Sequence, residues 1–321
     1  MSTPAAPISA VFVLEISDYS GPLLAGWLER GNSIKAIVVP ALRPKRGRFS
    51  IGNFRRKLQR GKHLSRYLGK TDFGLPDFEL IEFGRPYDWD KLGRQLSEIA
   101  ADVLICFAFP AIIPQSLLGL FPNGGLNLHP SLLPHYRGPH PLHRMVVDQQ
   151  QDAFGGVTLH KMTPRFDEGD ILAQVPVAAK AWLSRQALVK AHAEAMRIVV
   201  SESATAYCRG ELTGAPQPTG DFTWARIDMS HTLVSTNMSI EHVTRLWTVL
   251  GLAPGIYLTV GDAAVRLAFR IRTLGPATGK PPVRRWGAVS FDLANGRVVH
   301  LTYSRTIKRL VKIWQRFERD I

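Results

Sequence analysis

Two short apolar segments near the start of the chain, residues 10–14 and 34–39, are separated by enough sequence for one helix. The residues between them, 21–29, are predicted to form an amphipathic helix. A parallel strand pair needs such a crossover, so strand, helix, strand is the opening unit of α/β folds. The chain is therefore expected to begin as a parallel α/β sheet.

Later segments extend this sheet. A helical pattern over 87–100 leads into the apolar run 103–109, which is expected as a central strand and is followed by Pro110 and Pro114. Further strands are expected at 125–129 and 156–162, and a long helix at 184–207. Residues 1–209 are thus predicted to form a Rossmann-like, mostly parallel sheet with helices.

Residues 210–222 are rich in turn-forming residues and are expected to link two domains. Beyond them, a helix is expected at 240–250, and short antiparallel strands are expected at 256–260, 265–271, 287–291 and 298–303. Residues 223–321 are therefore predicted to form a small, β-rich, barrel-like domain. The chain closes with an apolar stripe at helical spacing that leaves Lys308, Lys312 and Arg316 on another face.

The net charge of +14 is concentrated in two places. Residues 43–70 contain eleven Lys or Arg and no acid, and residues 305–320 contain six basic and two acidic residues. Concentrated positive charge attracts polyanions, so a nucleic acid or another phosphate-bearing partner is favoured over two merely solvated basic faces.

Several classes of protein are disfavoured by the sequence. No apolar run reaches the roughly 18–20 residues that span a bilayer, and the apolar segment 7–16 is expected as a buried strand rather than a signal peptide. The two cysteines, Cys106 and Cys208, lie far apart and suit a reducing cytoplasm. No glycine-rich phosphate-binding motif follows the first strand.

The candidate chemistry lies in Asn127 and His129, which are two residues apart on an expected strand and so point to the same side. Open α/β sheets place ligand sites where such strands end. An amide and a histidine can donate hydrogen bonds to the oxygen of a carbonyl under attack by an amine. Asp167, in a turn after another strand, can charge the histidine and accept the amine proton.

Two longer motifs surround these residues. Residues 127–138 read N-L-H-P-S-L-L-P-H-Y-R-G and residues 156–170 read G-V-T-L-H-K-M-T-P-R-F-D-E-G-D. Both resemble the motifs of the 10-formyltetrahydrofolate-dependent formyltransferase family, which implies an enzyme that moves a formyl group from that folate to a primary amine. Within the family, the basic segment at 42–48 and residues 226–228 are most similar to members that act on methionyl-tRNA.

The resemblance also implies roles for particular residues. Asn127 and His129 would polarise the formyl oxygen, and Asp167 would orient and charge His129 and relay a proton. The residues implied at the folate are Phe107, Ala108, Phe109, Ile112, Arg165 and Phe166. The residues implied at the acceptor are Arg43, Lys45, Arg46, Arg48 and Arg137. No metal is expected, because the other histidines of the loop lack a ligand spacing.

The acceptor amine is left open by departures from the family pattern, at residues 12–19 after the first strand and at 135–141. Methionyl-tRNA, held through segment 43–70 and the basic terminal helix, is the first expectation. A nucleotide-linked amino sugar or another small amine is the alternative, and an inactive nucleic-acid-binding relative is a third. A cytoplasmic protein without a membrane partner, monomeric or weakly oligomeric, is expected.

Overall fold

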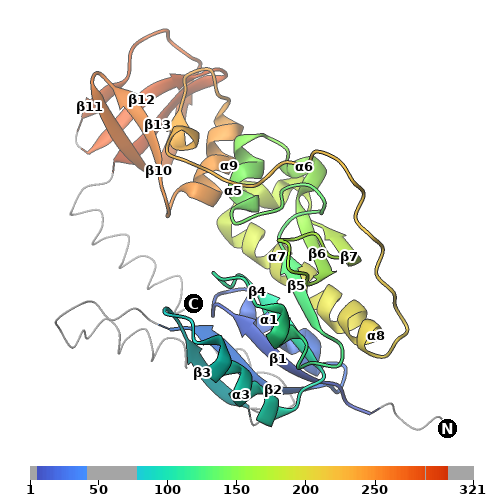
Figure 1. Cartoon of the computed structure of the whole chain (residues 1–321). Coiled ribbons are helices and arrows are strands. Elements are labelled where there is room, and N and C mark those ends of the chain that lie inside the picture. Colours follow the sequence, from blue (N-terminus) through green and yellow to red (C-terminus); the bar gives the residue numbers. More distant parts are fainter. Residues whose placement is uncertain (1–5, 42–77, 286, 303–321) are drawn as a thin grey trace. The chain divides into compact units, whose positions relative to one another are not determined.

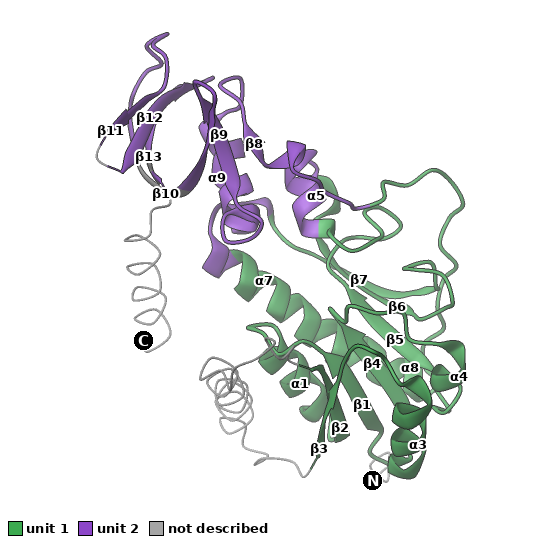
Figure 2. Ribbon diagram, turned by 60° about the vertical axis from the view of Figure 1, so that its left-hand side comes forward, with its two compact units in different colours: residues 1–141, 153–178, 188–224 green, residues 142–152, 179–187, 225–321 purple. Residues whose placement is uncertain are grey.

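The computed structural model describes residues 6–41, 78–285 and 287–302, and its contacts divide the chain into two compact units. Figure 2 shows the two units in different colours. The first contains Met1–Pro141, Ala153–Ala178 and Leu188–Trp224, and the second contains Leu142–Asp152, Ala179–Ala187 and Ala225–Ile321. The turn-rich residues 210–222 therefore group with the first unit, and two short stretches from before them group with the second.

The first unit is built on a seven-stranded sheet in the order β3-β2-β1-β4-β5-β6-β7 (Figure 1). Its first five strands by chain order run parallel to one another, which confirms the expected mostly parallel α/β architecture. These strands are β1 (Ser9–Leu14), β2 (Ser33–Pro40), β3 (Glu79–Phe83), β4 (Val103–Phe107) and β5 (Gly125–His129). All six residues of β1 and all five of β4 are buried, as their apolar sequences require.

Two further strands complete the sheet as an antiparallel hairpin, β6 (Gly156–Lys161) and β7 (Ile171–Pro176). The connection between them holds Asp167. Neither β3 nor β7 is predicted from the sequence, because each lies at a sheet edge and mixes polar with apolar residues. Edge strands face water more than central ones do, so their apolar pattern is weak.

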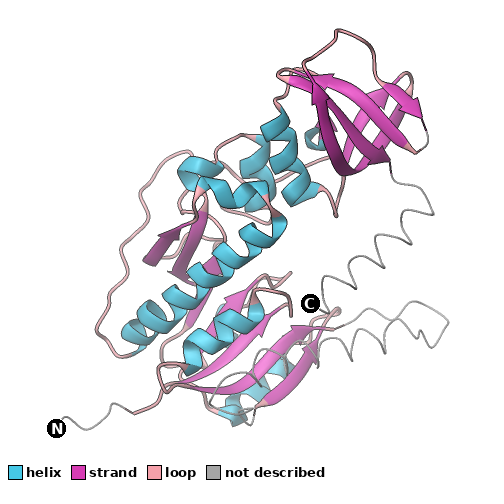
Figure 3. Cartoon of the chain, turned by 180° about the vertical axis from the view of Figure 1, so that it is seen from behind, coloured by secondary structure: helices cyan, strands magenta, loops and turns pink. Residues whose placement is uncertain are grey.

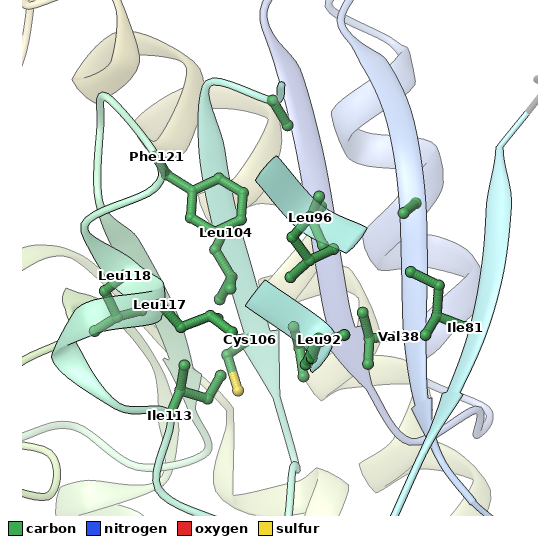
Figure 4. Close-up of a cluster of buried hydrophobic side chains, with 14 of the residues drawn as sticks. Val38, Ile81, Leu92, Leu96, Leu104, Cys106, Ile113, Leu117, Leu118 and Phe121 are labelled. Atoms are coloured by element: carbon green, nitrogen blue, oxygen red, sulfur yellow. The ribbon is translucent and has the colours of Figure 1, made fainter. Parts of the chain in front are cut away.

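Helices cover both faces of this sheet. In Figure 1, α3 (Trp89–Ile99) lies over one face, and in Figure 3 α1 (Ser20–Leu28) and α7 (Arg185–Ile198) lie over the other. The π-helix η2 (Val199–Ala204) and α8 (Thr205–Cys208) continue α7, and the short helix α4 (Gln115–Leu118) follows β4. Leu92 and Leu96 of α3 pack on Val38, Ile81 and other buried strand residues (Figure 4). This apolar contact holds α3 against the parallel part of the sheet.

The second unit contains a six-stranded sheet in the order β11-β12-β13-β10-β9-β8. Its strands are β8 (Leu233–Val234), β9 (Ile256–Val260), β10 (Ala263–Gly275), β11 (Val283–Arg285), β12 (Ala288–Leu293) and β13 (Gly296–Thr302). All neighbours are antiparallel except β8 and β9, so the β-rich prediction is confirmed. Helices α5 (Pro141–Val147), α6 (Gln151–Phe154) and α9 (Ile240–Leu250) and the 3-10 turns η1 (Ala179–Leu183) and η3 (Ser230–Thr232) complete the assigned elements of the described chain.

Candidate active site

Asn127 on β5 and His160 on β6 are cross-strand partners. The two residues lie directly opposite each other in the antiparallel ladder, and the Asn127 Nδ2 to His160 Nε2 distance is 3.0 Å. The Nδ1 atom of His160 is 2.8 Å from the backbone oxygen of Lys161, which can only accept, so Nδ1 carries the proton of the neutral ring. Nε2 then accepts a hydrogen bond from Asn127, and this bond orients the Asn127 amide.

His129 ends β5 and is 4% exposed. Its Nε2 lies 2.8 Å from the backbone oxygen of Tyr136, so Nε2 donates its proton there and Nδ1 is left as the basic position. Burial lowers the pKa of His129 below its ordinary value, and the nearby Asp167 carboxylate opposes this shift without reversing it. The resting ring is therefore neutral at pH 7, whereas the sequence favours a charged one.

Asp167 brings these groups together. Its Oδ1 is 3.6 Å from His129 Nδ1, 3.6 Å from His160 Nε2 and 3.4 Å from Asn127 Nδ2. Its Oδ2 accepts a hydrogen bond of 2.8 Å from the backbone N–H of Gly138. Burial by itself would raise the pKa of Asp167, but the two histidines and the Gly138 N–H outweigh it and lower the pKa to about 2. The carboxylate is thus ionised at neutral pH.

The backbone of Asp167 is in the left-handed region, with φ of 55°. A residue with a Cβ adopts this conformation at a cost of about 1 kcal/mol, so neighbouring contacts must hold it. Gln217 supplies two of them, since its Nε2 donates to the backbone oxygens of Asp167 and Gly169, both at 2.8 Å.

The loop after β5 is fixed by its own hydrogen bonds. Ser131 is fully buried and its hydroxyl donates to the oxygen of His135 at 2.8 Å. Thr158 Oγ1 accepts from the Leu133 N–H at 3.0 Å and donates to the Ser131 oxygen at 2.6 Å. These bonds fix the loop that places the Tyr136 carbonyl against His129.

The residues implied at the folate fall into two groups. Phe107 is 5% exposed and packs edge-on against Tyr19 at 5.7 Å between ring centroids, so it is largely a core residue. Phe109 is half-buried, and its ring lies 6.4 Å from that of Trp89. In contrast, Ala108 and Arg165 are exposed, and the side chains of Ile112 and Phe166 are 50% and 51% exposed. These four are free of the core and available to a ligand.

The residues implied at the acceptor are only partly described. Arg43, Lys45, Arg46 and Arg48 lie outside the described residues, as does the basic terminal segment. Arg137 is described, and its guanidinium is occupied within the first unit. Its Nε and Nη2 donate to Gln217 Oε1 at 3.1 and 2.6 Å, its Nη1 is 3.5 Å from Glu168, and its Cζ lies 5.4 Å over the Phe222 ring.

Three groups of this site are not predicted from the sequence: the Tyr136 carbonyl, the Gly138 N–H and the Gln217 amide. The first two are backbone atoms, which no residue type signals. Gln217 lies 50 residues from Asp167 in the chain and inside a stretch expected to be a linker. The ring of His160 also lies at the site, 3.0 Å from the Asn127 amide nitrogen.

Burial raises the pKa of both thiols, Cys106 and Cys208, to about 12, so each is protonated and unreactive at neutral pH. Among the described residues, no group of three or more His, Cys, Asp or Glu is arranged to hold a metal ion. The described helices are also too short or too polar for any of them to cross a bilayer.

A mostly parallel sheet with an amide, a histidine and an acid beside the end of β5 is the arrangement expected of a formyltransferase. The family comparison agrees with this class of protein. Residues 84–218 match the family described as formyl transferase.

Individual proteins narrow this class. The chain is 32% identical over 212 residues to the methionyl-tRNA formyltransferase of Bordetella parapertussis, a match that covers 64% of this chain and 66% of that protein. It spans 61% to 66% of the length of the first such relatives, which is less than two thirds.

Solved structures share the fold. HypX from Aquifex aeolicus, in complex with tetrahydrofolic acid, has a TM-score of 0.60 at 17% identity over 92% of this chain and 44% of its own. An N-formyltransferase from Helicobacter canadensis, in complex with folinic acid and dTDP-3-aminofucose, has a TM-score of 0.56 at 12% identity over 92% of this chain and 100% of its own.

Proposed function

We propose that this protein transfers a formyl group from 10-formyltetrahydrofolate to a primary amine. The observation that carries the proposal is that Asn127 Nδ2 and His129 Nδ1 both lie within 3.6 Å of the Asp167 Oδ1 atom. An ionised acid, a neutral histidine with a free basic nitrogen and an oriented amide form a set suited to acyl transfer between amines. No covalent nucleophile is required of the protein.

The side chains divide the work as follows. Asn127 has one amide hydrogen on His160 and a second on a long, weak bond to Asp167, and this second hydrogen is the one that turns to the carbonyl oxygen under attack. His129 accepts the proton that the attacking amine loses, and it does so at Nδ1, because Nε2 already donates to Tyr136. It returns this proton to the folate nitrogen as the bond between that nitrogen and the formyl carbon breaks. Asp167 stabilises the resulting imidazolium and holds its orientation.

Bound 10-formyltetrahydrofolate supplies the formyl group as the electrophile. The described residues fit such a donor, since Ile112 and Phe166 are half-exposed apolar residues and Ala108 is exposed, with φ of 52°. Apolar walls and open backbone groups suit a planar, hydrogen-bonding ring. We assign Phe109 and Arg165 to the same donor site, and Phe107 to its supporting core.

Methionyl-tRNA is the acceptor that we propose first. The curated relatives reported above carry that name, and the net charge of +14 is concentrated in segments 43–70 and 305–320. Lys and Arg clusters of this kind neutralise phosphates, so affinity should fall steeply with salt. In this proposal Arg43, Lys45, Arg46 and Arg48 contact the nucleic acid.

A nucleotide-linked amino sugar is the second candidate. It is favoured by the departures at residues 12–19 and 135–141, which border the acceptor side, and by a likeness to the N-formyltransferase fold over that enzyme's whole length. The basic segment would then bind a diphosphate. Because both thiols are free, we also propose a cytoplasmic protein, monomeric or weakly oligomeric.

One experiment separates the two acceptors. The purified full chain is incubated with 10-formyltetrahydrofolate and either methionyl-tRNA or a dTDP-linked amino sugar, and the formylated product is measured by mass spectrometry. Formyl-methionyl-tRNA that disappears between 50 and 200 mM salt supports the first proposal, as expected for several phosphate contacts. Product from the sugar alone supports the second, and product from neither contradicts both.

A charge-matched pair of variants sharpens this result. Replacing Lys45, Arg46 and Arg48 together by Gln should raise KM for methionyl-tRNA at least about ten-fold, because each such residue would contact phosphate. Replacing the exposed residues Lys35, Lys91 and Arg94 by Gln removes the same charge elsewhere and should leave KM unchanged. An equal effect of both sets would show that net charge, and not segment 43–70, governs binding.

A further inference from the structure

Gln217 makes four hydrogen bonds with a single side chain. Its Nε2 donates to the backbone oxygens of Asp167 and Gly169, both at 2.8 Å, and its Oε1 accepts from Arg137 at 3.1 and 2.6 Å. Both amide hydrogens and the amide oxygen are therefore engaged. The side chain joins the loop after β5, which holds Arg137, to the connection between β6 and β7, which holds Asp167.

The neighbours of Gln217 in sequence brace the same two loops. Trp224 packs against Gly138, where a Cβ would lie 2.9 Å from the indole ring, and it meets Phe166 edge-on at 6.3 Å between ring centroids. Phe222 lies under the Arg137 guanidinium. Segment 217–224 thus contacts the residues on either side of the hydrogen bond between Gly138 and Asp167.

We propose that Gln217 is a positioning residue that acts through Asp167, holding the carboxylate of that residue against His129. The Asp167 backbone is in a left-handed conformation that is costly for a residue with a side chain, and Gln217 fixes its carbonyl. Gly138 fixes the carboxylate of the same residue. Without Gln217, the backbone of Asp167 is no longer held in place. The distance from the Asp167 carboxylate to His129 is then no longer defined.

The decisive variant is Gln217→Met, which keeps the length of the side chain, changes no charge and removes all four hydrogen bonds. The readout is the amide proton of Gly138, which reports the charged hydrogen bond to Asp167 through its downfield shift. Glycine-selective ¹⁵N labelling of the full chain limits the spectrum to the 27 glycines, and Gly138→Ala identifies the signal. Gln217→Met is expected to move the Gly138 amide upfield, in the direction that Asp167→Ala moves it.

A double variant tests whether the effect passes through Asp167. If it does, adding Gln217→Met to Asp167→Ala should shift the Gly138 amide no further, because coupled residues are not additive. An unchanged Gly138 amide in Gln217→Met, or a full further shift in the double variant, would overturn the proposal. Gln95→Met is the matched control, since the Gln95 side chain makes an exposed 3.5 Å bond to Glu79, and it should leave the amide unmoved.

The second readout compares the effect on kcat with the effect on KM, and only this readout rests on the proposed function. Gln217→Met should lower kcat by roughly 10- to 100-fold with KM for the folate changed less than about three-fold, because a misplacement near 1 Å has effects of that size. Gln217→Glu keeps the acceptor for Arg137 but has no hydrogen for the two carbonyls. It should lower kcat similarly, and it remains measurable if the Met variant does not fold.

The two readouts fail separately. A wild-type protein without formyl transfer contradicts the proposed function, while the Gly138 amide still decides the role of Gln217. An unchanged kcat in a Gln217→Glu variant that retains the wild-type Tm would contradict the positioning role even in an active enzyme.

Discussion

Asn127 and His160 face each other across β5 and β6, with the amide nitrogen of one 3.0 Å from the ring nitrogen of the other. Because His160 Nδ1 donates a hydrogen bond to the Lys161 carbonyl, Nε2 of the neutral ring can only accept one from Asn127. The nitrogen side of the amide is therefore turned toward Asp167. A hydrogen-bond donor in this position is set before any substrate arrives.

Replacing Asn127 by Leu should lower kcat about 10²- to 10³-fold, the usual effect of losing one donor to a developing oxyanion. The folding stability should change little, since Asn127 is only partly buried. The measurement is a single-turnover formyl transfer assay together with thermal unfolding.

The matched control is Asn32→Leu. Asn32 is 5% exposed and bonds to Thr205 and Ile8 far from the site, so its loss should cost about 1–3 kcal/mol of stability and leave kcat unchanged. A fall in kcat for both variants would show that Asn127 acts through the fold.

Gly138→Ala should damage both the fold and the reaction. Gly138 has φ of 109°, and an added Cβ would lie 2.9 to 3.2 Å from three atoms of the Trp224 indole. The strain is expected to cost at least about 2 kcal/mol and to shift the N–H away from Asp167, lowering kcat roughly ten-fold or more. Denaturant unfolding and the transfer assay measure the two effects.

Gly31→Ala separates conformational strain from the clash. Gly31 has φ of 73°, but an added Cβ would meet nothing within 4 Å. Its cost should be about 1 kcal/mol, with kcat unaffected. If Gly138→Ala were no worse than Gly31→Ala, the contact with Trp224 would carry no constraint.

The rate of formyl transfer should fall as the pH is lowered below 6.5. Burial lowers the pKa of His129 below its ordinary value of 6.5, so the basic Nδ1 stays available from pH 8 down to 6.5 and is lost only below that. Single-turnover rates at saturating acceptor, with circular dichroism at each pH to confirm the fold, give this profile. A decline that begins above pH 7 would mean that His129 is charged at rest, as the sequence alone suggests.

The central strands of the first unit and the helix α9 are predictable from sequence because their apolar patterns are strong. The predictions for β5, α9 and β9 agree with the structure at both ends, β1 differs by one residue at its start, and β2 differs by one residue at each end. The edge strands β3 and β7 and the two-residue β8 are not predicted, because partial exposure or short length removes the pattern.

The groups of the site also divide into those that the sequence predicts and those that it does not. Asn127, His129 and Asp167 are predictable because the chemistry needs those side chains and the surrounding motifs are specific. The Gly138 N–H and the Gln217 amide are not, because a hydrogen bond to a backbone atom of a distant loop leaves no residue pattern. Nor is the neutral state of His129, which depends on burial that only the packed structure defines.

Folding stability should itself depend on pH through His192 of α7. Burial is the main cause that lowers its pKa to about 4, whereas the unfolded chain has the ordinary value of 6.5. The stabilising contribution of the neutral ring is therefore complete above pH 6.5 and is lost progressively as the pH falls toward 4. The change is on the order of 2–3 kcal/mol.

Denaturant unfolding at pH 7, 5.5 and 4.5 measures this dependence. His192→Gln, which cannot take up a proton, should flatten the slope between pH 6.5 and 4 relative to the wild type. The same slope in both proteins would assign the dependence to other groups.

The most direct test of the central claim is formyl transfer by Asp167→Asn, a variant that keeps the size of the side chain and removes its charge. Without the carboxylate, the imidazolium that forms when His129 accepts the amine proton has no counterion. The prediction is a wild-type protein that formylates a primary amine from 10-formyltetrahydrofolate, and a variant at least about 10³-fold slower in kcat with a similar Tm. A variant as active as the wild type would contradict the assignment of this site.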